Sequence, residues 1–285
     1  MKPAQFQYHA PERLDEATSL LAELGDGAKP LAGGQSLVPM MSLRLATFDH
    51  LVDLNRIAGL NTIERTNGHL RIGAMVRQAT AEHSAEVATS IPLLARALPL
   101  IGHFQIRNRG TVGGSVAHAD PASELPAVVL ALGAVIEAAG VSGARRIPSD
   151  QFFLSMWDTA LGDAEILSAV EFPVWGPNSG FAIEEVARRH GDFALVGAAV
   201  AVQCAQGDSV SRAGISLFGI GPTAVHSHEA EAALLGGASP EEVGRIAAST
   251  INPADDVHAS GAYRRQVAAV VVRRALTAAI KEAQS

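Results

Sequence analysis

The sequence contains 285 residues, of which 48% are hydrophobic and 18% charged, which is enough apolar material for one large domain or two ordinary ones. Its formal net charge is -7, and an acidic chain without a basic block is a poor candidate for binding nucleic acid, because phosphate binding needs clustered Lys and Arg. The single cysteine, Cys204, cannot form an internal disulfide or hold an iron–sulfur cluster, which fits a reducing cytoplasm.

The first part of the chain reads as short helices alternating with strands. Its N-terminus lacks the apolar core of a signal peptide. Helical spacing from Leu14 to Leu24 predicts a helix that stops at Gly25, and alternating residues around Asn67-Gly68 predict a hairpin over 61–75. The other predicted elements are, in order, a strand at 28–32, a short helix from Leu37, a strand at 50–54, a helical region at 80–100, a buried helix at 127–133, and strands at 134–140 and 164–174.

A change in composition at residues 173–180, PVWGPNSG, predicts a linker between two domains, which we place at 1–176 and 177–285. Three strands followed by three helices are expected beyond it, an order that indicates an α+β fold. The predicted strands cover 180–189, 193–203 and 212–221, and the predicted helices cover 226–236, 239–250 and 263–283. Apolar stretches throughout the chain are too short, or too interrupted by charge, to span a bilayer.

Two glycine-rich segments share one plan. In LAGGQS (31–36) and GTVGGS (110–115) a Gly-Gly pair is followed by a polar residue, and neither segment has the pattern of a P-loop or a Rossmann turn. Adjacent glycines let successive backbone N–H groups face one concavity, where Ser36, Thr111 and Ser115 can add hydroxyl groups. Two such loops suit the linked phosphates of a dinucleotide. The alternative, that both glycine pairs are only tight turns, stays open from the residues alone.

Three motifs together resemble the FAD-binding middle subunit of the molybdenum hydroxylases, the family of the carbon monoxide and xanthine dehydrogenases. They are KPLAGGQSLVPMMSLRLA (29–46), QIRNRGTVGGSVAHADPASELP (105–126) and ARRHGDFALVGAAV (187–200), and the likeness covers nearly the whole chain. The resemblance implies a two-lobed FAD-binding domain of the vanillyl-alcohol-oxidase (PCMH) type, with lobes at about 1–58 and 59–176. A C-terminal domain of three antiparallel strands and a helical bundle is expected to follow it.

The resemblance also implies which residues bind FAD. It places the pyrophosphate between Ala32, Gly33, Gly34, Gln35 and Ser36 on one side and Thr111, Gly113, Gly114 and Ser115 on the other. Further contacts are expected from Lys29, Leu31, Leu37, Ala117, Asp120, Ser123 and Glu124, and the flavin ring is expected near Ile101, Leu167 and Phe193.

The function implied by the resemblance is electron relay within a complex. Substrate is oxidised at a molybdenum cofactor in a large subunit, and electrons pass through two [2Fe-2S] clusters of a small subunit to FAD on this chain and then to an external acceptor. Two heterotrimers are expected to pair into a heterohexamer. We therefore assign no general base or nucleophile to this chain. A free-standing FAD-dependent oxidoreductase, and a non-redox phosphate-binding or assembly module, remain alternatives.

A few polar residues leave their roles open or depart from the family pattern. Glu184 and Glu185 stand in a stretch where many relatives carry Lys, so the choice of electron acceptor is open. Glu124 stands where Asp is commoner, and Asp120 can alternatively cap its own turn.

Charged side chains near the motifs have competing interpretations. Arg107 and Arg109 can offset phosphate charge or simply lie at the surface. His226 and His228 resemble a metal-binding pair, but residues two apart do not share one helical face and no third ligand is evident. We therefore expect a solvated helix start there, and no metal site.

Overall fold

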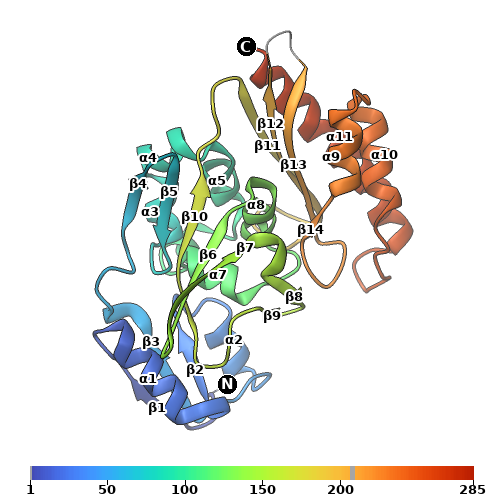
Figure 1. Cartoon of the computed structure of the whole chain (residues 1–285). Helices are drawn as coiled ribbons and strands as arrows, with labels where there is room; N and C mark the ends of the chain where they lie inside the picture. The colour runs from blue at the N-terminus through green and yellow to red at the C-terminus, as the bar shows by residue number, and fades with distance from the viewer. Residues whose placement is uncertain (1, 206–208) are drawn as a thin grey trace.

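A computed structural model describes residues 2–205 and 209–285, and its N-terminal lobe is built on a parallel sheet (Figure 1). The strand order is β1–β3–β2. Helix α1 buries Ala17 and Leu21 against Val52 and Leu54 of the lobe and stops at Gly25, whose φ of 59° suits glycine. The elements are β1 (Gln7–His9), α1 (Leu14–Leu24), β2 (Ala28–Leu31), α2 (Leu37–Ser42) and β3 (His50–Asp53).

The second lobe contains an antiparallel sheet of order β4–β5–β10–β6–β7. Its first hairpin turns at Asn67-Gly68, where both residues have positive φ, as predicted. The strands are β4 (Ile63–Thr66), β5 (His69–Gly73), β6 (Val135–Gly140), β7 (Gly143–Pro148) and β10 (Ile166–Pro173), with a separate hairpin of β8 (Phe153–Ser155) and β9 (Asp158–Thr159). The helices are α3 (Gln78–Glu82), α4 (Ala85–Ser90), α5 (Pro92–Ala97), α6 (Phe104–Arg107), α7 (Val112–His118) and α8 (Glu124–Leu132).

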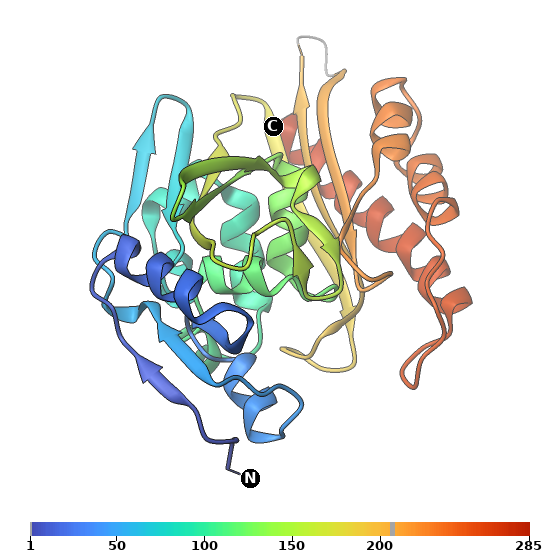
Figure 2. The same cartoon turned by 60° about the horizontal axis from the view of Figure 1, so that its bottom comes forward.

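The C-terminal part is an antiparallel sheet, β11–β12–β13–β14, with three helices on one face and the rest of the chain on the other (Figure 2). Helix α11 lies so close to β11 that a Cβ on Gly180 would stand 1.8 Å from the carbonyl oxygen of Ala279. The strands are β11 (Ser179–Ala187), β12 (Ala194–Cys204), β13 (Val210–Phe218) and β14 (Val225–His226). The helices are α9 (His228–Leu235), α10 (Pro240–Ser249) and α11 (Gly261–Ala283).

Helix α8 joins the second lobe to the C-terminal sheet, and all nine of its residues are buried. It packs on β12 and β13, where Gly214 lies against the carbonyl oxygen of Ala131. One hydrophobic cluster accordingly contains residues of both parts, among them Val128, Phe172 and Phe218. The α8 interface is therefore a continuous core.

Most of the predicted elements are present, with differences that have local causes. The helical region at 80–100 is broken into α3, α4 and α5, because the Ser84 side chain caps a new helix at α4 and Pro92 starts another at α5. The strands β1, β7, β8 and β9 and the helices α6 and α7 were not predicted. The second glycine-rich segment was expected to be a loop, but Gly113 and Gly114 lie in the first turn of α7. Strand β7 is almost wholly exposed and so shows no apolar alternation. The predicted helix 226–236 begins only at His228, since His226 pairs with β13 as part of a fourth strand.

In the described ranges 2–205 and 209–285, no helix combines the length and the apolar character that crossing a membrane requires.

Candidate functional site

A cleft of about 760 Å³ runs between the two N-terminal lobes and is closed on one side by residues 191–193 of the C-terminal part. Of the nineteen cofactor residues predicted from the sequence, all but one line this cleft. The exception is Leu31 of β2, which lies behind the first glycine loop with its Cδ1 3.3 Å from the place of a Cβ on Gly34. The structure therefore brings the two predicted loops into one cavity.

The two glycine loops touch each other along their backbones. A Cβ on Gly33 would lie 2.4 Å from the carbonyl oxygen of Arg109 and 2.8 Å from Cα of Gly110. A Cβ on Gly114 would lie 3.1 Å from Cβ of Ala32. Side chains at Gly33 or Gly114 would force the loops apart, so glycine is needed here for close approach.

The backbone N–H groups of the two loops are used differently. In the second loop, Gly113 N–H donates to Ala74 O (3.0 Å) and Gly114 N–H donates to the Thr111 hydroxyl oxygen (3.0 Å), which caps α7. Within the described part of the chain, no hydrogen-bond acceptor meets the N–H groups of residues 33–37. The expectation that both loops present free amides was wrong for the second. Of these two loops, only the first offers free backbone donors. The second contributes hydroxyl groups and, through its glycines, lets neighbouring backbone or a ligand come close.

A pair of side chains outside the cleft holds the loops together. Asn55 Nδ2 donates to the carbonyl oxygen of Ala32 (3.0 Å), and Arg77 donates to Asn55 Oδ1 (2.6 Å) and to the carbonyl oxygen of Arg109. Neither residue was predicted from the sequence, since an Asn after a strand and a lone Arg carry no pattern. We call Asn55 and Arg77 the loop clamp.

The two arginines of the second motif do not face the cleft as counter-charges. Arg107 forms an ion pair with Glu82 at 2.7 Å and donates to Ile101 O at 3.0 Å, so it braces the segment before the loop. Arg109 contributes its backbone carbonyl oxygen, which accepts a hydrogen bond from Arg77. Arg107 therefore fits neither interpretation left open from the sequence, because it does not line the cleft and its side chain is only 11% exposed.

A neutral carboxyl group lies deeper in the cleft. Burial, with smaller contributions from the carboxyl groups of Glu185 and Asp120, raises the pKa of Glu124 to about 8. Burial also raises the pKa of Glu185 to about 7. Asp120 Oδ1 accepts a hydrogen bond from Ala122 N (2.9 Å), which is the turn-capping alternative considered from the sequence. At neutral pH the Glu124 side chain can donate a hydrogen bond without adding negative charge to the cleft.

Aromatic side chains stand at the mouth of the cleft. Trp157, from the unpredicted β8–β9 hairpin, stacks on His118 with ring centroids 6.1 Å apart, and burial lowers the pKa of His118. Phe193 lines the cleft although its side chain is 65% exposed.

A two-lobed α+β chain whose two glycine-rich segments meet in one partly apolar cleft has the features of a protein that binds a nucleotide cofactor. Residues 4–175 match the family model described as the FAD binding domain in molybdopterin dehydrogenase, and residues 181–279 match the CO dehydrogenase flavoprotein C-terminal domain. The chain belongs to this family of FAD-binding subunits of molybdopterin dehydrogenases, as the resemblance predicted.

Two of the relatives match over nearly their whole length. The alpha subunit of the 6-hydroxypseudooxynicotine dehydrogenase complex of Paenarthrobacter nicotinovorans is 40% identical, over 100% of this chain and 97% of the relative. The carbon monoxide dehydrogenase medium chain of Hydrogenophaga pseudoflava is 39% identical, over 98% of each.

Solved structures confirm the predicted fold. A carbon monoxide dehydrogenase structure from Hydrogenophaga pseudoflava has a TM-score of 0.95 at 40% identity, covering 99% of each chain. Quinoline 2-oxidoreductase from Pseudomonas putida 86 has a TM-score of 0.93 at 34% identity, covering all of both chains.

The cleft fits the cofactor of this family. Its volume lies in the range of cofactor sites, the free amides of residues 33–37 suit a diphosphate, and Gly114 leaves room for a close approach. The protein is thus an FAD-binding oxidoreductase subunit.

Proposed function

We propose that this chain is the electron-transfer subunit of a cytoplasmic molybdenum hydroxylase complex. It would accept electrons from iron–sulfur clusters of a small subunit, while a large subunit carries the molybdenum cofactor and oxidises the substrate. Relatives named as complex subunits or medium chains, matched over nearly their full length, support this role. We propose domains at 1–176 and 177–285, and a dimer of heterotrimers as the assembly.

The proposal assigns separate tasks to the two glycine loops. The N–H groups of residues 33–37 would bind the diphosphate of FAD, and Gly114 would let it lie close to the second loop. The hydroxyl of Ser115, 3.2 Å from that of Ser123, would complete the contacts. Bound FAD supplies the chemistry that joins two-electron and one-electron transfer. Residues of this chain bind and orient it.

The deeper cleft residues would position the rest of the cofactor. Glu124, neutral near pH 7, would donate a hydrogen bond to a hydroxyl group of FAD. Leu167 and Ile101 would pack on the ring system, and the exposed Phe193 would lie between the cofactor and a partner. The observation that carries the proposal is that residues 33–37, whose amides have no acceptor among the described residues, line the same cleft as Gly114.

Flavin retention tests the site. The purified full-length chain should be yellow with one FAD per chain, and Gly114→Val should lose the visible flavin band, because its side chain would meet Thr111 Oγ1 and Ala32 Cβ. Gly221→Val is the matched control, since its nearest neighbour would be 3.9 Å away. A Gly114→Val chain that folds and retains FAD normally would refute the loop assignment.

Co-purification tests the electron-transfer role. A tagged chain expressed in its native host should bring down two further subunits, one containing iron and sulfide and the other molybdenum, in a mass that corresponds to two heterotrimers. Without added dithionite, the substrate of the complex should reduce the flavin, seen as loss of its visible absorption band, only when both partner subunits are present. A chain that purifies alone and turns over its own substrate would instead establish a free-standing oxidoreductase.

A further inference from the structure

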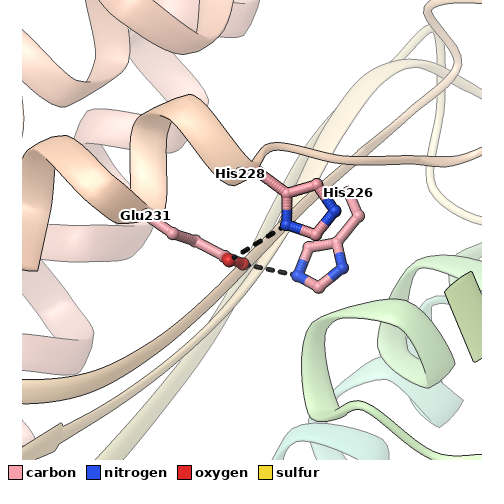
Figure 3. A group of neighbouring side chains, drawn as sticks. All are labelled: His226, His228 and Glu231. Atoms are coloured by element: carbon pink, nitrogen blue, oxygen red, sulfur yellow. Dashed lines mark hydrogen bonds and ion pairs between the residues drawn. The ribbon is translucent and has the colours of Figure 1, made fainter.

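Three potential metal ligands meet where β14 leads into α9, away from the FAD cleft (Figure 3). His226 ends β14, His228 is the first residue of α9, and Glu231 follows one turn later. One nitrogen or oxygen atom from each residue lies within 4.8 Å of the other two. His226 lies on a strand, so the two histidines do not belong to one helix as was expected, and Glu231 is a third potential ligand that was not predicted from the sequence.

The backbone around this cluster holds the carboxylate in place. Strand β14 pairs with β13 at Ser216 and His226, and Ser227 N–H donates to Ile215 O at 2.8 Å. Ile215 N–H donates in turn to Glu231 Oε1 at 2.7 Å. A carboxylate oriented by a hydrogen bond from outside the ligand set is the usual arrangement around a bound metal.

The side chains are arranged so that a metal ion needs only small shifts. His226 Nε2 lies 2.5 Å from Glu231 Oε1, and His228 Nδ1 lies 3.6 Å from Glu231 Oε2. A tetrahedral ion with bonds of about 2.0–2.1 Å holds neighbouring ligand atoms about 3.3 Å apart. These two distances, each to a different oxygen of Glu231, differ from that spacing by less than about 1 Å, and one candidate ligand atom from each residue lies within 4.8 Å of the others. Figure 3 shows both imidazole rings turned toward the same carboxylate.

The surroundings leave the ligands available. The side chains of His226 and Glu231 are 19% and 14% exposed, whereas that of His228 is 69% exposed. Nδ1 of His226 is buried and has no hydrogen-bond partner among residues 2–205 and 209–285, so the hydrogen bonds of this ring are confined to Nε2, whose partner Glu231 belongs to the same cluster. The site is thus reachable from solvent through His228 while its other ligands are fixed.

We propose that His226, His228 and Glu231 form a site for a divalent transition metal. Two imidazole nitrogens and one carboxylate oxygen suit Zn²⁺, Co²⁺ or Ni²⁺, and water completes the coordination. The metal clips β14 to the start of α9 and takes no part in electron transfer, because none of the three residues lines the FAD cleft.

Metal binding to the full-length, FAD-loaded chain without a polyhistidine tag tests the proposal. After chelator treatment, one equivalent of Co²⁺ should give the visible absorption of a nitrogen- and oxygen-ligated ion, and Zn²⁺ should displace it. His228→Ala and Glu231→Gln should each weaken binding at least about tenfold and leave the flavin band unchanged. Because protons compete for the imidazoles, affinity should fall as the pH is lowered.

His258→Ala is the matched control, since His258 is also exposed and lies in the same C-terminal part. It should bind metal as the wild type does. The proposal is overturned if no stoichiometric binding occurs, or if His228→Ala and His258→Ala bind Co²⁺ and Zn²⁺ with equal affinity. Because His228 is exposed, its replacement by Ala should leave the fold intact, and a retained flavin band verifies that it does. Lost metal binding in this variant is then not explained by misfolding.

Discussion

Gly33→Ala is the substitution that tests the contact between the two loops most directly. The added Cβ would stand 2.4 Å from the carbonyl oxygen of Arg109, whereas ordinary contact begins near 3.4 Å, so the loops must separate by roughly 1 Å. Overpacking of this kind costs about 1–3 kcal/mol. The free chain can relieve the clash by opening, but FAD binding needs both loops in place. The Kd for FAD should therefore rise about 5- to 150-fold.

Quenching of flavin fluorescence on titration of the apoprotein would measure this change. Gly221→Ala serves as the control, because its Cβ meets nothing closer than 3.9 Å. The control should bind FAD as the wild type does. If Gly33→Ala folds and binds FAD with wild-type affinity, the contact between the loops does not shape the site, and the reasoning is wrong.

Two further predictions concern residues around the cleft. Asn55→Ala removes the hydrogen bond to Ala32 O and one acceptor of Arg77. Although Asn55 lies outside the cleft, FAD affinity should fall about 3- to 10-fold in the same titration. An unchanged Kd would show that the loop clamp is dispensable. Glu124 has a pKa of about 8 against an ordinary value of 4.5, so the folded FAD-free chain keeps a proton that the unfolded chain loses. Its contribution to stability is therefore lost as pH rises from about 4.5 through about 8. Over this range the urea midpoint of the wild type should fall relative to that of Glu124→Gln, and parallel pH profiles of the two midpoints would contradict the prediction.

The parts of the site that were predictable from sequence are those that depend on backbone chemistry. Gly33 and Gly114 drew notice because two glycine pairs of the same design, each followed by a polar residue, suit an anion, and the family motifs extended the prediction to much of the cleft wall. What the motifs do not contain is the direction of each N–H group. That Thr111 consumes the Gly114 amide follows from capping geometry, which depends on how α7 begins.

The features that were missed depend on residues brought together from distant segments. Asn55 and Arg77 are 22 positions apart and carry no periodic signal, so only the folded chain shows that they hold the loops. The β8–β9 hairpin that supplies Trp157 is short and partly exposed, which removes the apolar alternation on which strand prediction relies. The cluster around His226 was missed because a two-residue strand was read as part of a helix.

The burial of every residue of α8 has a consequence for protein engineering. Its surface is shaped on one side by the second lobe and on the other by β12 and β13, with Gly214 permitting backbone contact at Ala131. A chimera that joins the FAD-binding part of one relative to the C-terminal sheet of another would have side chains that no longer pack together at this interface. A successful exchange would require α8 and β13 to be taken from the same relative.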